Sequence, residues 1–284
     1  MKRAAVESWV LVVLLTGCSR HPSTGALIEQ LGSADEKSRL EAAYALARRG
    51  EEVVPAMIEA LDDERPLVRD WAIRTLGEMG QRAEPAIPRL VQALDDTDHE
   101  VRRSAAFVLG MNLRAPPALP SLILKIQDPA PEVRTASIRA LSILGLDPGV
   151  VIPAIAAALR DPEATVRAAA ATALGTFPKE ATATLPELLA ALDDGSPSVR
   201  GTAAGVIGEI GPAARPAFDR LVRAMNDDAD QGVRKAAAEL SRASAPRPCL
   251  RSSMPSGTAI ASRGSAWSTP WAPWGARRGM PSRL

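Results

Sequence analysis

The residues of this sequence that could do chemistry are, first of all, aspartates that recur at regular intervals. Each lies six residues before an arginine. A row of carboxylates can bind metal ions, because hard cations prefer oxygen ligands. Each acid here comes with its own cation, however, so the spacing favours ion pairs over a metal site. The pairs are Asp63 and Arg69, Asp96 and Arg102, Asp128 and Arg134, Asp161 and Arg167, Asp194 and Arg200, and Asp228 and Arg234.

The histidines and cysteines form no catalytic set. His21 lies near the N-terminus, His99 is followed by Glu100, and Cys249 has no histidine near it in the sequence. Two cysteines are too few for a disulfide framework or a zinc site. The sequence offers no Ser/His/Asp set and no glycine-rich phosphate loop. We therefore expect a protein that is not an enzyme, with no cofactor, no metal and no small-molecule substrate.

The first residues, MKRAAVESWVLVVLLTGCSR, are built like a targeting signal. Lys2 and Arg3 precede an apolar run over residues 9–15 that is too short to span a bilayer. The stretch LLTGC resembles the lipobox of bacterial lipoproteins. The resemblance implies a signal peptide over residues 1–17, lipid on Cys18 and a lipidated tether over residues 18–23. Several acyl chains give a stable membrane anchor.

The lipobox also implies a location. A serine, Ser19, follows the cysteine. By resemblance to enteric sorting rules, a residue other than aspartate at this place favours the outer membrane. We therefore expect a protein of the bacterial cell envelope that is anchored through Cys18 and faces the periplasm or the cell surface.

A sequence motif of the form VR..AA..LG recurs along the chain with nearly constant spacing. Its arginines are 30 to 34 residues apart, a period that indicates a stacked array of repeated units. Because a single unit cannot bury its apolar stripe alone, such units have to pack on one another. The arginines are Arg39, Arg69, Arg102, Arg134, Arg167, Arg200 and Arg234.

Each unit contains two predicted helices. The first carries a proline that suits the first turn of a helix, and the second carries an apolar stripe at helical spacing. A glycine follows the last strong apolar residue of several second helices, where a helix end tolerates it. The prolines are Pro55, Pro88, Pro120, Pro153 and Pro186. One stripe is Val68, Ala72, Leu76 and Met79. The glycines are Gly77, Gly110, Gly175 and Gly208.

These columns resemble the short HEAT-like repeats of phycobilin lyases and deoxyhypusine hydroxylases, over residues 24–243. The resemblance implies an all-α fold, an α-α superhelix or solenoid of about seven helical hairpins. An enzyme of the lyase or hydroxylase kind is therefore the alternative function. The iron ligands of deoxyhypusine hydroxylases are His-Glu pairs inside the second helix, whereas His99 and Glu100 lie at a predicted helix start. By the same resemblance, the repeated Asp and Arg side chains should form a ladder along the stacked units.

What remains for function is a surface. Residues two, six and ten positions after the valine column share one side of the second helices, which we call the partner face. In the first four units they are Leu40, Tyr44, Arg48, Asp70, Arg74, Glu78, Arg103, Phe107, Met111, Thr135, Arg139 and Ile143. Aromatic, Met and Arg side chains are enriched at protein interfaces. The sequence thus suggests a scaffold that binds another protein through Tyr44, Arg74, Phe107, Met111 and Arg139, but packing of Tyr44 and Phe107 against neighbouring units stays open.

The end of the chain differs from the repeats. Residues 244–284 are rich in Pro, Ser, Gly and Arg and contain no acidic residue, so we expect a disordered basic tail. A slipped reading frame in a GC-rich gene would produce this composition, and so would a tail that contacts anionic lipid. The repeats themselves carry more acidic than basic side chains, which argues against nucleic acid as a partner.

Overall fold

The computed structural model describes residues 22–178, 180–210, 214 and 218–235, and this part of the chain contains helices and turns but no strands. The prediction of an all-α superhelix is confirmed. The first helices of the units are α2 (Thr24–Leu31), α4 (Val54–Glu59), α6 (Ile87–Gln92), α8 (Leu119–Lys125), α10 (Pro148–Ala157), α12 (Leu185–Ala191) and α14 (Phe218–Asp227). The second helices are α3 (Glu36–Arg49), α5 (Pro66–Met79), α7 (His99–Phe107), α9 (Pro131–Leu144), α11 (Ala164–Gly175) and α13 (Pro197–Ile210).

Short 3-10 segments join or extend these helices. They are η1 (Gly50–Val53), η2 (Ala60–Asp62), η3 (Gly80–Ala86), η4 (Ala93–Asp95), η6 (Pro116–Ala118), η7 (Ala158–Arg160) and η8 (Glu180–Thr184). One unit differs, because α7 continues into a π-helical turn, η5 (Val108–Asn112). A π-turn shifts the side chains that follow it, and such turns often lie at functional sites.

Five of the six described second helices begin where the sequence supplies a start signal, and α11 begins without a first-turn proline or a capping side chain. Proline occupies the first turn of α5, α9 and α13, where its missing N–H leaves no bond unmade. Asp35 caps α3 by accepting the N–H of Ser38 at 2.8 Å, and Asp98 caps α7 by accepting the N–H of Glu100 at 2.9 Å. Each second helix therefore starts at the same place in its unit, which sets the register of the side chains that follow.

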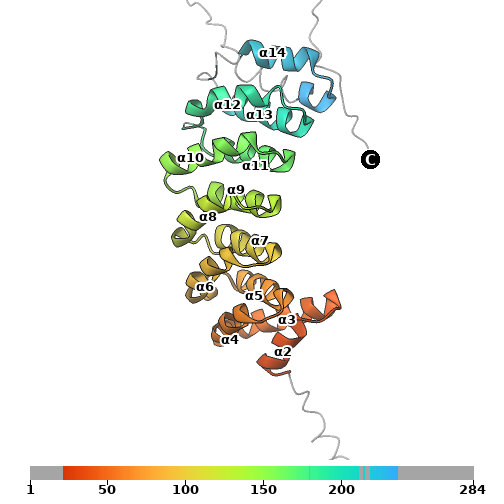
Figure 1. The fold of residues 1–284 in the computed structure, drawn as a ribbon, viewed down its shortest axis with the longest axis vertical. Coiled ribbons are helices and arrows are strands. Elements are labelled where there is room, and N and C mark those ends of the chain that lie inside the picture. The colour runs from red at the N-terminus through yellow and green to blue at the C-terminus, as the bar shows by residue number, and fades with distance from the viewer. Residues whose placement is uncertain (1–21, 179, 211–213, 215–217, 236–284) are drawn as a thin grey trace, which may run out of the picture. The chain divides into compact units, whose positions relative to one another are not determined.

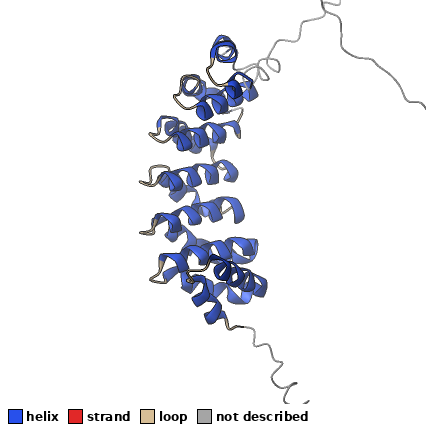
Figure 2. Ribbon diagram, turned by 90° about the vertical axis from the view of Figure 1, so that its right-hand side faces the viewer, coloured by secondary structure: helices blue, strands red, loops and turns tan. Residues whose placement is uncertain are grey.

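The helices stack in two layers (Figure 1). Consecutive second helices pack directly on one another, as α7 does on α9 and α9 on α11. The first helices instead contact the 3-10 segment that leads into the next first helix, as α4 does η3 and α6 does η6. The turns lie along one edge of the stack (Figure 2). No described helix is long and apolar enough to cross a bilayer.

The core lies between the layers and between the units. The stripe Val68, Ala72 and Leu76 of α5 is fully buried, and so are Leu90 of α6 and Leu109 of η5. At roughly 25 cal/mol per Å² of apolar surface, burying each Val or Leu among these side chains favours the folded state by about 1.5–3 kcal/mol. Because a lone unit would lose the contacts that these side chains make with the neighbouring units, stacking stabilises every unit.

One detail of the predicted units was wrong, and a second holds only in part. Pro153 lies inside α10 rather than in its first turn, because Pro148 begins this helix one turn earlier. The glycine column marks a helix end only in part, because Gly175 is the last residue of α11 whereas Gly77 and Gly208 lie two residues before the ends of α5 and α13. The glycines that end helices with positive φ are Gly50, Gly80 and Gly145.

The glycine column reflects close packing between units. A Cβ atom on Gly77 would lie 2.8 Å from Cγ2 of Val108, and one on Gly110 would lie 2.3 Å from the Cβ of Ala140. Real Cβ atoms essentially never approach that closely. These glycines therefore let each second helix touch the next one.

Candidate functional site

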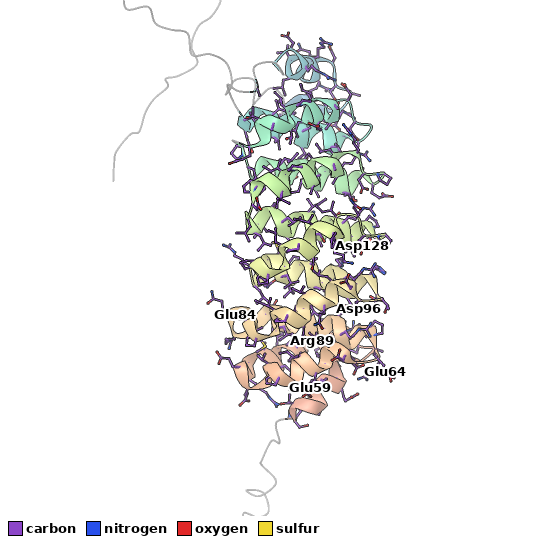
Figure 3. All side chains as sticks on the ribbon, turned by 60° about the vertical axis from the view of Figure 1, so that its left-hand side comes forward. Glu59, Glu64, Glu84, Arg89, Asp96 and Asp128 are labelled. Atoms are coloured by element: carbon purple, nitrogen blue, oxygen red, sulfur yellow. The ribbon has the colours of Figure 1, made fainter. Side chains whose placement is uncertain are left out.

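The ladder runs along the turn edge of the stack, and it joins neighbouring units rather than residues of one unit. Each arginine binds the aspartate of the following unit with two parallel hydrogen bonds, from Nε and from Nη2. All the N–O distances lie between 2.7 and 2.9 Å. The pairs are Arg69 with Asp96, Arg102 with Asp128, Arg134 with Asp161, Arg167 with Asp194 and Arg200 with Asp228. Asp96 and Asp128 lie one above the other along this edge (Figure 3).

The same side chains also hold the turn of their own unit. Arg102 donates through Nη1 to the backbone carbonyl of Asp96 at 2.8 Å and to that of Thr97 at 3.1 Å. Asp128 accepts the N–H of Ala130 at 3.0 Å, which shapes the turn that leads into α9. Each arginine thus ties its own turn to the next one, and the pattern repeats from unit to unit.

The ladder pairs are largely shielded from water. Their arginine side chains are 11–17% exposed and their aspartates 2–13%. The hydrogen bond from its arginine lowers the pKa of Asp194, and the pKa of Asp228 is lowered in the same way. Burial by itself raises the pKa of Asp128, but hydrogen bonds from Arg102 and from the Ala130 N–H outweigh it and hold the pKa below its ordinary value.

These lowered pKa values predict that the array is unstable in acid. An aspartate with a depressed folded pKa adds stability above its unfolded pKa of about 3.9, and this is lost as the pH falls through the folded pKa. We expect helix content, followed by circular dichroism, to hold down to about pH 4 and to be lost below it. Asp128→Asn removes one titrating group, so the free energy of unfolding of this variant should decrease less steeply as the pH is lowered. An unchanged pH dependence in this variant would contradict a role for the ladder.

The first unit departs from the ladder. Arg39 donates to the carbonyls of Ser33 and Ala34, but its guanidinium lies over the ring of Trp71, 5.4 Å from the centroid. Its Nε is buried without a hydrogen-bond partner among the described residues. The carboxylate of Asp63 instead binds Arg65 at 2.8 and 2.9 Å. The ladder therefore starts at Arg69, and its other end, Arg234, donates to the carbonyl of Asp228 at 2.6 Å.

Sequence reasoning missed a second, outer row of ion pairs. The aspartate just before the ladder aspartate binds a cation on the first helix of the next unit. The pairs are Asp62 with Arg89, Asp95 with Lys125 and Asp193 with Arg220. Their carboxylates are 69–76% exposed, so each pair contributes only about 0–1 kcal/mol. The sequence signal for this outer row was a second aspartate directly before the ladder aspartate at these three turns.

The partner face lies on the side of the second helices away from the first helices. Tyr44 is 54% exposed, Phe107 48% and Met111 40%, and Arg139 is exposed as well. Arg74 is half-buried. The two aromatic rings therefore do not disappear into the core, which leaves a large apolar area open to solvent. In the later units the same face offers mostly small side chains, such as Thr172 and Gly205, with Glu209 as an exception.

The partner face is hollowed over α5. A cavity of about 320 Å³ lies there, with Leu40 and Tyr44 of α3 on one side and Phe107 of α7 on the other. Trp71 and Thr75 of α5 belong to its lining and are themselves buried, so they form its floor. The remaining lining residues are Ala43, Arg74, Glu78, Arg103, Ser104, Val108 and Asn112. We call this cavity the hollow. Of the predicted binding residues, it brings together Tyr44, Arg74 and Phe107, while Met111 and Arg139 lie outside its lining.

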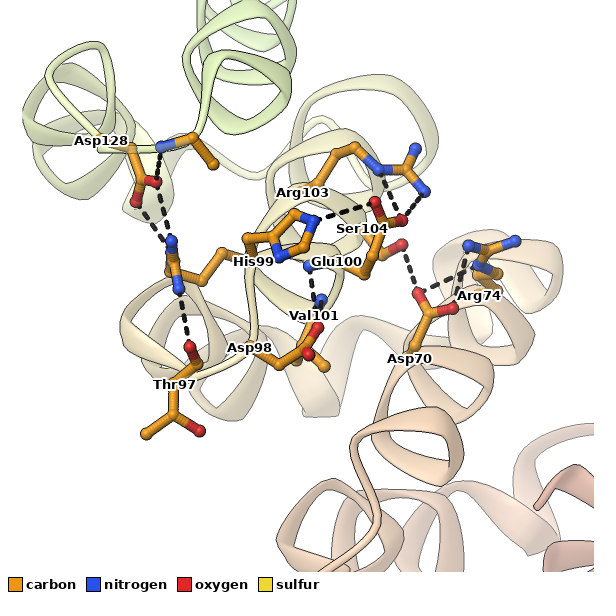
Figure 4. Close-up of polar contacts among 12 residues, drawn as sticks. Asp70, Arg74, Thr97, Asp98, His99, Glu100, Val101, Arg103, Ser104 and Asp128 are labelled. Atoms are coloured by element: carbon orange, nitrogen blue, oxygen red, sulfur yellow. Dashed lines mark hydrogen bonds and ion pairs between the residues drawn. The ribbon is translucent and has the colours of Figure 1, made fainter.

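A buried polar cluster supports the floor of the hollow. The carboxylate of Asp70 is buried, accepts a hydrogen bond from Ser104 of α7, and pairs with Arg74 at 2.9 and 3.0 Å (Figure 4). Arg74 also lies over Trp71, 5.3 Å from the ring centroid. A positive charge above an aromatic face is favourable by about 0.5–2 kcal/mol. Sequence reasoning missed the bond between Asp70 and Ser104, because it crosses units and belongs to no repeated column.

The structure places His99 in the first turn of α7. Its Nε2 lies 3.5 Å from the Oε1 atom of Glu100, whose other oxygen binds Arg103 (Figure 4). Among the described residues, no three His, Cys, Asp or Glu side chains are grouped so that they could hold a metal ion.

Several sequence predictions lie outside the described residues. These are the signal peptide over residues 1–17, the lipidated Cys18 and most of the tether up to residue 23. The basic tail over residues 244–284, with Cys249, also lies outside them. The structure therefore says nothing about the anchor or the tail.

The comparisons with known proteins concern the repeats. A family model described as HEAT repeats matches residues 24–106, 87–153 and 152–241. The sequence matches no curated protein.

Solved structures share the fold. An engineered protein is similar with a TM-score of 0.54 at 21% identity, covering 76% of this chain and 67% of its own. A mutant of Kap121p is similar with a TM-score of 0.62 at 16% identity, covering 78% of this chain and 29% of its own. The complex of CpcE and CpcF of phycocyanin lyase from Nostoc sp. PCC7120 is 29% identical over 53% of this chain and 96% of its own, with a TM-score of 0.48. At these values, the first two likenesses support the fold alone.

Proposed function

Because this chain belongs to the family of HEAT-repeat proteins, we propose that it is a scaffold that binds another protein, rather than an enzyme. The observation that carries the proposal is the partner face in the first units. There, half-exposed Tyr44 and Phe107 flank a hollow with arginines in its lining. Aromatic and Arg side chains can each supply more than about 1 kcal/mol at an interface.

A photo-crosslinking experiment in the native organism tests this proposal. A photoreactive amino acid replaces Tyr44 or Phe107 in the full-length protein, with Thr172 on the same face as the control position. We expect positions 44 and 107 to crosslink the same protein and position 172 not to crosslink it. Equal crosslinking from all three positions, or from none, would refute the proposed face.

The alternative function is an enzyme related to phycobilin lyases or deoxyhypusine hydroxylases. Metal analysis of the purified protein separates the hydroxylase part of this alternative from the scaffold. Iron bound in stoichiometric amount would overturn the proposal that the protein is not an enzyme. A protein free of iron that still crosslinks through Tyr44 and Phe107 would favour the scaffold.

The proposed scaffold is held at a membrane of the bacterial cell envelope through lipid on Cys18. The support is the LLTGC stretch after a short apolar run. Because lipid is the anchor, Cys18→Ser should move the protein from the membrane fraction to the soluble fraction and abolish labelling with palmitate. Membrane binding that persists in this variant, together with an unlabelled wild-type protein, would show that another segment is the anchor.

A further inference from the structure

We propose that the hollow accepts one face of an acidic amphipathic helix of the partner protein. The inference deepens the proposed scaffold function and depends on it, because it specifies the chemistry of the segment that the partner face recognises. Three features carry it: the apolar walls of the hollow, the arginines in and beside it, and the spacing of the helices that form it.

The apolar lining of the hollow comes from both of its walls. Leu40 and Tyr44 stand on α3, Phe107 stands on α7, and all three are exposed. Between them α5 contributes the buried side chains of Trp71 and Thr75 to the floor, and the half-buried Arg74 and exposed Glu78 to the rest of the lining. An apolar side chain that enters this space is enclosed by rings and methyl groups, and it removes those groups from water. Such a recess fits a projecting side chain and not a flat surface.

The charged part favours a negatively charged segment. Arg74 and Arg103 line the hollow together with Glu78. The carboxylates of Asp70 and Glu100 neutralise the two arginines, so the excess positive charge comes from Arg48 and Arg139 beside the hollow. Arg74 and Arg103 each bind their carboxylate through Nε and Nη2, which leaves their Nη1 donors without a partner among the described residues.

Two more arginines extend this charge beyond the hollow. Arg48 lies one helical turn after Tyr44 on α3, and Arg139 lies on α9. Both are exposed, and within the described part of the chain neither side chain makes a hydrogen bond or an ion pair. Carboxylates on the partner could bind these arginines, and also the free Nη1 atoms of Arg74 and Arg103, without displacing an existing contact.

The spacing favours a helix over an extended strand. The described chain has no sheet edge to which a strand could add, and a recess with apolar walls between helices suits recognition of the helix-in-groove kind. Helices α3 and α7 are separated by α5, and two packing distances amount to about 16–20 Å between their axes. A helix with its side chains is about 10–12 Å across. Less one helix diameter, this separation leaves a gap of about 4–10 Å between the two walls, so side chains from one face of a helix can enter the hollow while the helix itself lies above α5.

Two other occupants fit the charges or the shape less well. The chain's own tail, residues 245–284, carries six arginines and no acid, so it would meet like charge on the partner face. An anionic bilayer has the right charge, but its flat surface cannot enter a recess between two helices. The experiment below includes both as outcomes.

Peptide selection on the full-length protein tests the proposal. A phage-displayed library of random peptides of about 15 residues, a length at which isolated helices become marginally stable, is selected on the wild-type protein. In a counter-selection step, the library is first passed over the Tyr44→Ala/Phe107→Ala variant, so that peptides that bind elsewhere on the protein are discarded. We expect enriched peptides with net negative charge and apolar residues at i, i+3 or i+4, and i+7. Enrichment of neutral or basic peptides, or no enrichment over the variant, would overturn the proposal.

Charge variants provide a second readout, measured with the most enriched peptide by fluorescence anisotropy. Arg48→Gln with Arg139→Gln should weaken its binding about tenfold, a change of about 1.4 kcal/mol. Glu78→Gln should strengthen it, because it removes the carboxylate from the hollow. Thr172→Ala with Thr176→Ala should leave the dissociation constant unchanged. Variants that only perturb the fold cannot change affinity in opposite directions, so equal effects of the arginine and glutamate variants would refute the charge argument.

The remaining outcomes separate this inference from the scaffold function. If the wild-type protein binds anionic vesicles through Arg48 and Arg139 more tightly than it binds any peptide, the occupant is a membrane and the inference is wrong. If deletion of residues 245–284 exposes a site that was blocked, the tail is the occupant and the inference is again wrong. A crosslinked partner whose contact segment is not acidic refutes the chemistry proposed here, while the scaffold function stands.

Discussion

Replacing Arg102 by methionine is expected to lower the free energy of unfolding by about 3–5 kcal/mol. Arg102 makes two hydrogen bonds to Asp128, whose side chain is only 2% exposed, and two to the carbonyls of the turn before its own helix. Methionine keeps much of the apolar stem but leaves the buried carboxylate without its cation. Urea unfolding followed by circular dichroism measures the change.

Two control variants identify the cause of this loss. Arg102→Met with Asp128→Asn removes the buried charge but keeps an oxygen that can accept the Ala130 N–H, so it should recover much of the lost stability. Arg89→Met breaks an ion pair whose carboxylate, Asp62, is 70% exposed, so its effect should stay within about 0.5 kcal/mol. If the double variant is no more stable than Arg102→Met, the unpaired carboxylate is not what destabilises the single variant.

Gly110→Ala should be nearly as damaging, with a loss of about 3 kcal/mol, at the upper end of what an overpacked core costs. The new Cβ would lie 2.3 Å from the Cβ and 2.4 Å from the Cα of Ala140, so the backbones of η5 and α9 would have to separate. Hydrogen exchange should show this as faster exchange in α7 and α9.

Gly205→Ala is the matched control within the same array. Gly205 lies inside α13, and a Cβ atom there meets nothing within 4 Å. Alanine should therefore raise the stability by up to about 1 kcal/mol through its better helix propensity. If both substitutions destabilise the array equally, the loss reflects glycine flexibility rather than contact between the units.

The sequence indicated the fold because the same pattern recurs in every unit. The stripe Val68, Ala72, Leu76 is repeated with constant spacing. Apolar residues that recur at the same place in every unit are core positions, whereas a single apolar residue can stand there by chance. It also placed Tyr44 and Phe107 on the correct side of their helices, since a fixed offset from the valine column fixes the direction of a helical side chain. Both conclusions need only the order and spacing of residues along the chain, and not how the units are placed on one another.

The direction of the ladder and the role of the glycines could not be obtained in this way. The spacing places Asp63 six residues before Arg69. Arg69, however, donates a hydrogen bond to the backbone carbonyl of Asp63, and its ion pair is with the carboxylate of Asp96 in the next unit. Gly77 has no room for a side chain because Val108 of the next unit lies against it, and the buried carboxylate of Asp70 accepts a hydrogen bond from Ser104 of the next unit. In each case the decisive partner belongs to a neighbouring unit, and its distance depends on how the units stack.

The forward reach of each ladder arginine has a consequence for how such a gene can change length. Every ladder pair links one unit to the unit directly after it and to no other. A tandem duplication of one whole repeat would therefore supply, at both of its junctions, an arginine facing an aspartate, and deletion of one whole repeat would rejoin the same partners. The paired Arg and Asp lie 26 to 28 residues apart in the sequence, so small differences in turn length also keep the pairs. An insertion that separated two stacked units would instead leave a buried carboxylate unpaired, which is strongly destabilising. Recombination in steps of a full repeat is thus a large change in length that keeps every ladder pair.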